Sequence, residues 1–312
     1  SNLTIAENSA NGTVIGEVNA TDPDGDTNIT FSLVPPLTSD LNLSLWLDAS
    51  QLTNAGTVWE DLSGMDNNVT KHGSPTVIQN AQNGLSLMRY SGASDEYHSF
   101  PRMTDIRTVF WVTNRSGIDD ESRFLLGDST SYNFHAHGRI FWNSSTVLTS
   151  SIRSGTTRLN GSSIDGRTTN LPSELSVISL KTTGNVSASS FSKDRHIDVR
   201  NWKGDLGELM IFNYPLADSK IEKIEGYLAY KWGLVDSLAS DHPYLNGANL
   251  FDLDSNGTLS TTQAFDYETD DRNYTITVWA TDDHNAYFDK NFTISVTNVV
   301  EDLDGDETED HY

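Results

Sequence analysis

Apolar and polar residues alternate in short runs near both ends of the chain, which predicts β-strands there. These runs are Leu3–Ile5, Thr13–Val18 and Asn28–Val34 near the start, and Leu250–Leu253, Gly257–Leu259, Tyr274–Trp279 and Asn291–Val296 near the end. Glycine and the turn Asp22–Asp26 separate them. Because three N-terminal strands cannot close a sandwich alone, we expect both ends to form one β-sandwich of about a hundred residues.

The segment between the two ends, residues 38–246, has alternating runs of its own and is also predicted to be mostly β. These runs are Ser44–Leu47, Thr108–Val112, Val177–Leu180 and Glu208–Phe212. One helix is expected late in the segment, where four apolar residues share a helical face: Ile221, Ile224, Leu228 and Trp232. A capping box of Ser219 and Glu222 predicts its start, and Gly233 predicts its end.

The composition is that of a folded and strongly acidic protein. The 312 residues include 20 Lys and Arg against 44 Asp and Glu, and the net charge of −24 disfavours nucleic acid and favours cations as partners. The absence of cysteine excludes disulfides and thiolate metal sites. No run approaches the roughly 20 apolar residues of a membrane span, so we expect no membrane insertion. The abundance of Asn, Thr, Ser and Asp is typical of extracellular proteins, and we expect a fragment that begins at Ser1.

The chain opens with TIAENSANGTVIGEVNATDPDGD and closes with LFDLDSNGTLSTTQAFDYETDDRNYTITVWATDDHNAYFDKNFTISVTNVVED. Both segments follow the motif order of cadherin-like repeats, which they resemble. Residues 38–246 stand where that family has the loop between its third and fourth strands. The resemblance therefore implies a cadherin-like (Ig-like) β-sandwich, formed by residues 1–37 and 247–301, that an insert interrupts.

The same resemblance implies calcium sites at both ends of this sandwich. In cadherin-like repeats an early Glu, an Asp-x-Glu loop and an acidic exit linker form one group, and the matching residues here are Glu7, Asp266, Glu268, Glu301 and Asp302. An Asp-x-Asp turn and an Asp after the fifth strand form the other group, matched by Asp22, Asp24 and Asp282. Ca²⁺ takes about six to eight oxygen ligands, which such loops supply. The alternative is that these Asp residues only favour turns.

The acidic tail, residues 302–312, contains Asp302-Leu-Asp-Gly-Asp-Glu-Thr-Glu-Asp310. It resembles the Asp-rich calcium loops of thrombospondin type 3 repeats, because alternate carboxylates can wrap around a cation. A solvated acidic linker is the alternative, and both interpretations stay open.

Several fragments of the insert point to a second domain. They are LWLDAS, WEDLSG, WKGDLGELMIFNYPL and IEKIEGYLAYKWGL. These fragments resemble concanavalin A-like, laminin G-type jelly rolls of bacterial exoproteins. The resemblance implies that residues 38–246 form a jelly-roll sandwich with one C-terminal helix, so that the whole chain is all-β. Ligand sites of such jelly rolls lie on loops at the rim of the sandwich.

Two turn-rich stretches of the insert carry polar groups suited to binding a sugar. Asp128, His135 and His137 lie in the first stretch, and Asp194 and Arg195 lie in the second. The Asp–Arg pair offers an acceptor and a bidentate donor for hydroxyl groups. An internal ion pair that pins one loop to another is the open alternative.

Trp and His are two further residue types that could contact a ligand. Trp142 could stack on a sugar ring, with a place in the core as the alternative. The His135-x-His137 spacing puts both rings on one face of a strand, which is compatible with zinc, although no Cys or clear third ligand supports it.

No catalytic motif stands out in the sequence. Glycoside hydrolysis needs two carboxyl groups that face the scissile bond. Asp205 and Glu208 have an odd spacing and would point to opposite faces of a strand, so we expect no enzyme. We expect instead a calcium-dependent, lectin-like module of a bacterial cell-surface adhesin. Its partners would be a cell-surface glycan or polysaccharide and neighbouring adhesin repeats, and a structural or protein-binding extender is the alternative.

Overall fold

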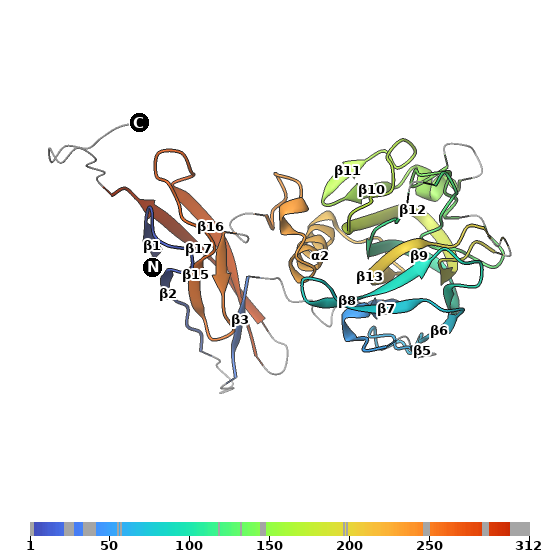
Figure 1. The fold of residues 1–312 in the computed structure, drawn as a ribbon, viewed down its shortest axis with the longest axis horizontal. Coiled ribbons are helices and arrows are strands. Elements are labelled where there is room, and N and C mark those ends of the chain that lie inside the picture. Colours follow the sequence, from blue (N-terminus) through green and yellow to red (C-terminus); the bar gives the residue numbers. More distant parts are fainter. Residues whose placement is uncertain are drawn as a thin grey trace. The chain divides into compact units, whose positions relative to one another are not determined.

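The computed structural model describes residues 3–21, 28–33, 42–54, 56, 58–117, 119–131, 133–143, 148–195, 197, 199–245, 250–282 and 287–299. The chain divides into two compact units: unit 1 comprises residues 1–38 and 243–312, and unit 2 comprises residues 39–242. Both units consist mainly of β-strands (Figure 1), which confirms the predicted all-β fold class. Among the helices that the structure describes, none has the length and apolar character needed to cross a bilayer.

Unit 1 is built from two sheets, and both ends of the chain contribute to each of them. Within the described residues, one sheet has the order β1 (Leu3–Ala6), β17 (Tyr287–Thr297), β16 (Asn273–Thr281) and β3 (Thr30–Ser32). The other has the order β14 (Phe251–Leu253), β15 (Thr258–Thr261) and β2 (Val14–Glu17). The first strand, β1, runs parallel to the last strand, β17, with Leu3 opposite Ile294. Segments far apart in the sequence therefore share one core.

The core of unit 1 follows the alternation of its strands. Ile276 and Val278 on β16 are buried together with Ile294 on β17, whereas Thr275 and Thr293 on the same strands are exposed. Three aromatic rings pack against one another with centroids 5.1 to 5.7 Å apart: Phe251, Phe265 and Tyr274. This packing brings the turn after Phe265 close to β1, where Asn8 N–H donates to the Phe265 carbonyl at 2.8 Å.

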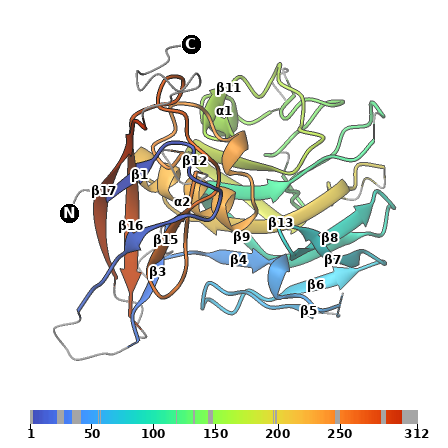
Figure 2. The ribbon, with the colours of Figure 1, turned by 60° about the vertical axis from the view of Figure 1, so that its left-hand side comes forward.

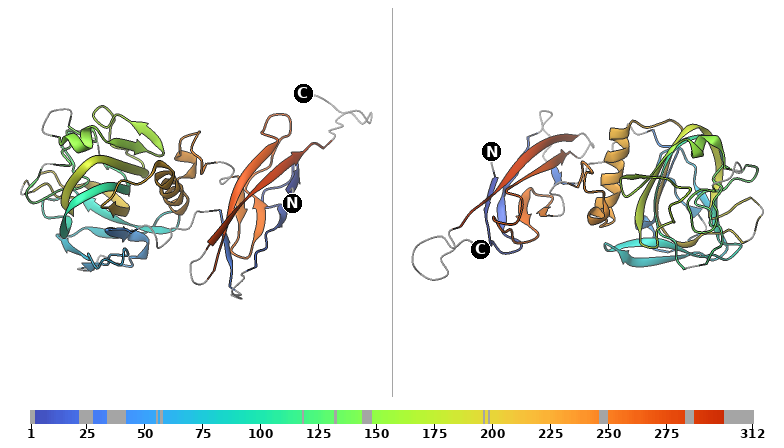
Figure 3. Two further views of the ribbon diagram at one scale, coloured as in Figure 1. Left: turned by 180° about the vertical axis from the view of Figure 1, so that it is seen from behind. Right: turned by 90° about the horizontal axis from the view of Figure 1, so that it is seen from above.

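Unit 2 contains a hydrogen-bonded network of ten strands within its described residues. They are β4 (Leu45–Asp48), β5 (Val58–Trp59), β6 (Val69–His72), β7 (Thr76–Gln82), β8 (Leu85–Ser91), β9 (Tyr97–Thr113), β10 (Thr156–Leu159), β11 (Ser162–Ile164), β12 (Ser176–Phe191) and β13 (Lys203–Phe212). The long strand β9 pairs with β6 near its start and with β13 near its end. The register between β9 and β12 shifts between Lys181 and Val186. Such irregularities bend strands, and Figure 3 shows these strands curving around the core.

The predicted late helix is α2 (Asp218–Lys231), preceded in the chain by the short helix α1 (Ser150–Arg153). Gly233 ends α2 in the left-handed conformation with φ of 64°. Its N–H donates to the Tyr230 carbonyl, and the Leu234 N–H donates to the Ala229 carbonyl, which is a Schellman motif. The predicted apolar face is buried. The predicted capping box is wrong, because Ala217 is the N-cap residue and Ser219 lies inside the first turn.

A buried charge centre joins β4, β13 and α2. The Lys231 ammonium donates to Glu208 Oε2 at 2.8 Å and to Asp48 Oδ2 at 2.6 Å. The indole N–H groups of Trp46 and Trp232 donate to the Glu208 carboxylate at 2.7 and 2.8 Å. Burial raises the pKa of Glu208, and the charge of Lys231 counteracts that rise. Both buried acids, Asp48 and Glu208, therefore depend on the same cation, Lys231.

Candidate metal centre and candidate ligand residues

Three carboxylates meet at one end of unit 1. Glu7 follows β1, and Asp266 and Glu268 lie in the turn between β15 and β16. One ligand oxygen of each lies within 4.8 Å of the others. Two oxygens on opposite sides of a calcium ion are about 5 Å apart, twice a bond length of about 2.3–2.6 Å, so this spacing fits a shared ion. Among the described residues, this is the one group of three or more carboxylate or imidazole side chains close enough to share a metal ion.

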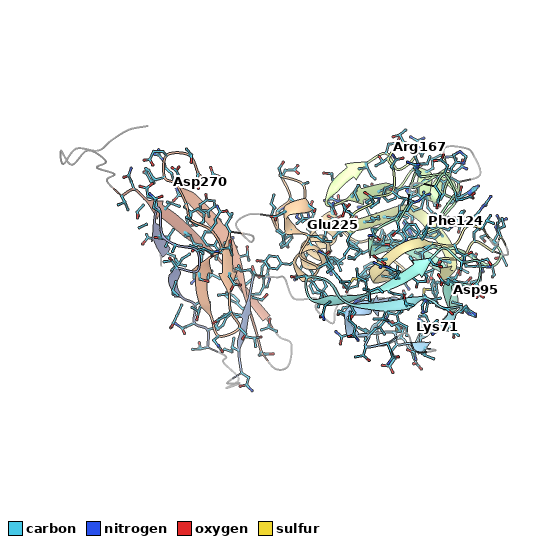
Figure 4. The ribbon with its side chains drawn as sticks, viewed as in Figure 1. Lys71, Asp95, Phe124, Arg167, Glu225 and Asp270 are labelled. Carbon is cyan, nitrogen blue, oxygen red and sulfur yellow. The ribbon has the colours of Figure 1, made fainter. Side chains whose placement is uncertain are left out.

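Backbone groups hold these carboxylates in place. Glu7 is only 3% exposed, and its two oxygens accept N–H groups from Tyr267 at 2.9 Å and from Val299 at 2.5 Å. Asp266 Oδ1 accepts the N–H groups of Glu268 and Thr269 at 2.9 and 3.1 Å, which fixes the turn. Both ends of the chain are thereby tied to the Glu7 side chain. Figure 4 labels Asp270, which accepts the Asp266 N–H at 3.0 Å in the same turn.

The carboxylates differ in how readily they ionise. The N–H groups of Val299 and Tyr267 hold the pKa of Glu7 below its ordinary value. A hydrogen bond from the Thr269 side chain lowers the pKa of Asp266. Desolvation and the charge of Glu7 raise the pKa of Glu268. The group therefore concentrates negative charge on oxygen ligands, the donor set that a hard divalent cation prefers.

The other predicted calcium ligands are only partly described. Glu301 and Asp302 of the first group, and Asp22 and Asp24 of the second, lie outside the described residues. Asp282 is described, half-buried at the end of β16. The acidic tail also lies outside the described residues.

In unit 2, Asp128 is buried in an ion pair. Arg102 donates from Nε and Nη2 to its two oxygens, both at 2.8 Å. The Arg102 side chain is half exposed, whereas that of Asp128 is buried. This bidentate arrangement corresponds to the internal ion pair that the sequence left open.

Asp194 is the centre of a second ion-pair cluster. Arg195 donates to both of its oxygens at 3.0 and 3.2 Å, and Arg200 donates to Oδ2 at 2.9 Å. Arg200 also lies over the ring of Phe124 at 5.7 Å, and His135 stacks on the same ring with centroids 5.7 Å apart. Figure 4 labels Phe124 on the side of unit 2 opposite Glu225 of α2. Three of the predicted ligand residues, Asp194, Arg195 and His135, therefore lie in one region, together with Arg200 and Phe124.

Two sequence expectations about this region need correction. Residues 135–137 do not form a strand: His135 is half-buried, whereas His137 is exposed and forms an isolated bridge with Ile140. Desolvation, reinforced by the charge of Arg200, lowers the pKa of His135. Trp142 is only 2% exposed, and its indole N–H donates to Thr157 Oγ1 at 2.8 Å. It belongs to the core, so the expectation that it faces a ligand is wrong.

The partners of these acids are not among the residues that the sequence predicted. Arg102 and Arg200 were not singled out, and neither were Lys231 and Asp48 beside Glu208. Asp205, weighed as a catalytic acid, binds Arg89 through two bonds of 2.7 and 2.9 Å. No local pattern in the sequence marks these pairs, because they bring together residues from separate strands and loops.

Comparisons with known proteins give little likeness. No family model matches the chain, and no curated protein matches it. A search of solved structures finds a crystal structure of the protocadherin gammaB4 extracellular domain, with 15% identity and a TM-score of 0.15. That match covers 96% of this chain and 48% of the other, so the chain spans about half the length of that structure.

Proposed function

We propose that the chain is a calcium-binding module of a bacterial cell-surface adhesin, in which unit 1 is a cadherin-like sandwich and unit 2 is an inserted, laminin G-type binding unit. The observation that carries the proposal is the meeting of Glu7, Asp266 and Glu268 within 4.8 Å. These residues match the calcium motif that the sequence resembles. Ca²⁺ at this point would link the first strand to a turn 260 residues later, with Glu301 and Asp302 as candidates for the remaining ligands.

The distribution of charge supports a cation in unit 1. Unit 1 has 2 Lys and Arg against 21 Asp and Glu, a net charge of −19, whereas unit 2 has 18 against 23, a net charge of −5. Most of the total of −24 therefore falls in the smaller unit. Self-repulsion of this size destabilises a compact fold, and bound divalent cations reduce it.

The proposal assigns ligand binding to unit 2, with a glycan as the ligand and without catalysis. The gathering of polar residues around Asp194 supports a binding role. The ion pairs of Asp128 and Asp194 favour the alternative, a structural or protein-binding extender, because both acids already have internal partners. A glycan array probed with and without EDTA separates the two: calcium-dependent spots support the adhesin, and a blank array supports the extender.

Calcium binding is tested directly by titration calorimetry and by melting of the full chain in EDTA and in excess Ca²⁺. Calcium at a hundred times its Kd should stabilise unit 1 by about 2.7 kcal/mol. Glu268→Gln is the informative variant, because it removes a ligand and also a carboxylate whose pKa is raised by desolvation and by the charge of Glu7. This variant should melt no lower than the parent in EDTA while it loses most of the calcium-induced shift.

Asp252→Asn is the matched control, since Asp252 is an exposed carboxylate of unit 1 on β14. It should bind calcium as the parent does. A melting temperature that is the same in EDTA and in excess Ca²⁺ would refute the calcium proposal, as would an equal loss of binding in both variants.

A further inference from the structure

A recess in the surface of unit 2 lies beside β4 and β5. Its volume is about 270 Å³. One wall is formed by Gln51, the last residue of the short 3₁₀ turn η2 (Ala49–Gln51), and by Leu52, Thr53 and Asn54, and the other by Gly56, Val58, Glu60 and Leu62. Asp48 and Trp59, which are both buried, also line it and form its base. Figure 2 shows β4 and β5 on the same edge of unit 2.

The walls of this recess are fixed to the rest of the unit. Asp61 accepts N–H groups from Trp46 and Asn67, each at 2.9 Å, and Leu62 N–H donates to the Trp46 carbonyl at 2.8 Å. On the opposite wall, the Gln79 side chain donates to the Thr53 carbonyl at 2.7 Å. At the base, Asp48 is bound to Lys231 of the buried charge centre. A ligand would therefore meet a largely preorganised surface, which lowers the entropic cost of binding.

The lining combines two kinds of group. Glu60 offers an exposed carboxylate acceptor, while Gln51 and Asn54 offer amides that both donate and accept. The other acid of the lining, Asp48, is already paired with Lys231. Leu52, Val58 and Leu62 supply apolar surface beside them. A few polar groups next to an apolar wall are what fixes the hydroxyl groups and the C–H face of a sugar ring. Every residue that lines the recess in the described structure is acidic or uncharged, which disfavours an anionic ligand.

Two exposed apolar side chains line the same recess, and a third follows closely in the sequence. Val58 is 53% exposed, Leu62 43% and Met65 63%. They are three of the seven large apolar side chains that are exposed among the described residues, and they fall within eight positions of the sequence. Clustered exposed apolar surface marks interaction sites more often than scattered residues do.

We propose that this recess is the sugar-binding site of unit 2 and that it takes the ring of a neutral pyranose. The inference rests on the proposed sugar binding by unit 2, but it moves the site away from the residues that the sequence predicted. Asp128 and Asp194 already bind guanidinium groups, whereas Asn54 and Glu60 are exposed at the wall of the recess. The volume lies just below the roughly 300–1,000 Å³ of small-molecule pockets, which suits one ring at the end of a chain.

The test titrates the isotopically labelled full chain with methyl glycosides of glucose, galactose, mannose and N-acetylglucosamine, with the amide of Gly56 and the imidazoles of His135 and His137 as NMR reporters. At least one glycoside should shift Gly56 in a saturable manner. Gly56→Trp should abolish that binding, because a Cβ at this position meets nothing closer than 3.7 Å and a large side chain would fill the recess. Gly56→Ala, which leaves the recess open, is its control.

A second pair of variants tests the polar contacts. Glu60→Gln should weaken binding by about tenfold, as expected for loss of one charged acceptor, whereas Glu174→Gln, an exposed acid of unit 2 elsewhere, should not. Methyl glucuronide should bind less tightly than methyl glucoside. Shifts of the imidazoles without a shift of Gly56 would refute the recess while sugar binding stands. If no glycoside shifts any reporter, or if Gly56→Trp binds like the parent, the inference is wrong, and calcium binding by unit 1 is unaffected by either result.

Discussion

Lys231 is the residue whose replacement most directly tests how unit 2 is held together. Its ammonium group lies 2.6 Å from Asp48 and 2.8 Å from Glu208, and both carboxylates are buried. Lys231→Met keeps most of the volume of the side chain and removes only the charge. The two acids would then face each other in the interior without a cation.

The expected cost follows from the burial of the pair. Removal of one partner of a buried ion pair costs about 3–5 kcal/mol. The Lys231 side chain is 17% exposed, which places the value near the lower end. At about 2–4 °C per kcal/mol for a domain of this size, a loss of about 3 kcal/mol lowers the melting temperature of unit 2 by about 6–12 °C.

The same variant should show a changed dependence on pH. Burial raises the pKa of Glu208, and without Lys231 that rise becomes larger. When the folded state raises the pKa of an acid, the protein loses stability as the pH rises through that folded-state pKa. The deficit of Lys231→Met should therefore be greatest at neutral pH and shrink as the pH falls toward 4.5, the ordinary value for glutamate.

Urea unfolding followed by tryptophan fluorescence measures this loss in the full chain, because six of the seven Trp residues belong to unit 2. Lys220→Met, a change at an exposed lysine of the same helix, is the control and should stay within about 0.5 kcal/mol of the parent. A Lys231→Met variant as stable as that control at pH 7, or one whose deficit does not shrink in acid, would refute the reasoning.

Two further predictions concern buried groups of unit 2. Arg102→Ala should destabilise the unit more than Asp128→Ala, because the first variant leaves a buried acid without its partner whereas the second leaves a half-exposed arginine that can turn to water; equal losses in urea unfolding would contradict this. Desolvation lowers the pKa of His98 from 6.5 to about 3, so its contribution is complete above pH 6.5 and is lost as the pH falls toward 3. His98→Gln should flatten the pH dependence of the urea midpoint in that range, and an unchanged slope would count against the assignment.

The strands and the helix could be predicted because their signals are local. The alternation around Ile276 and the helical spacing of Ile224 and Leu228 report burial directly, and the left-handed Gly233 needs no partner to end a helix. The predicted start of α2 was wrong, because several neighbouring residues could begin the first turn of the helix. Ala217 takes the cap position without a side-chain hydrogen bond.

A candidate site could be predicted only where its residues belong to recognisable sequence motifs. Glu7, Asp266 and Glu268 could be grouped from the resemblance. By contrast, no local feature of the sequence predicts the ion pair between Arg102 and Asp128, because such pairs depend on how strands and loops pack. The recess beside β5 was missed for a related reason: Asn54 and Glu60 have no charge pattern or spacing that distinguishes them from ordinary loop residues.

The parallel pairing of β1 with β17 has a mechanical consequence. Leu3 lies opposite Ile294 and Ala6 opposite Thr297, so a pull on the segments before β1 and after β17 slides the two strands along each other. All the hydrogen bonds of the pair then resist together, whereas a pull across the strands would open them one at a time. Because unit 2 is connected to unit 1 at residues between these two strands, a force applied to the ends of the chain travels through β1 and β17 and leaves unit 2 unstretched. Rupture under tension would therefore begin at the terminal strands, while the inserted unit keeps its fold.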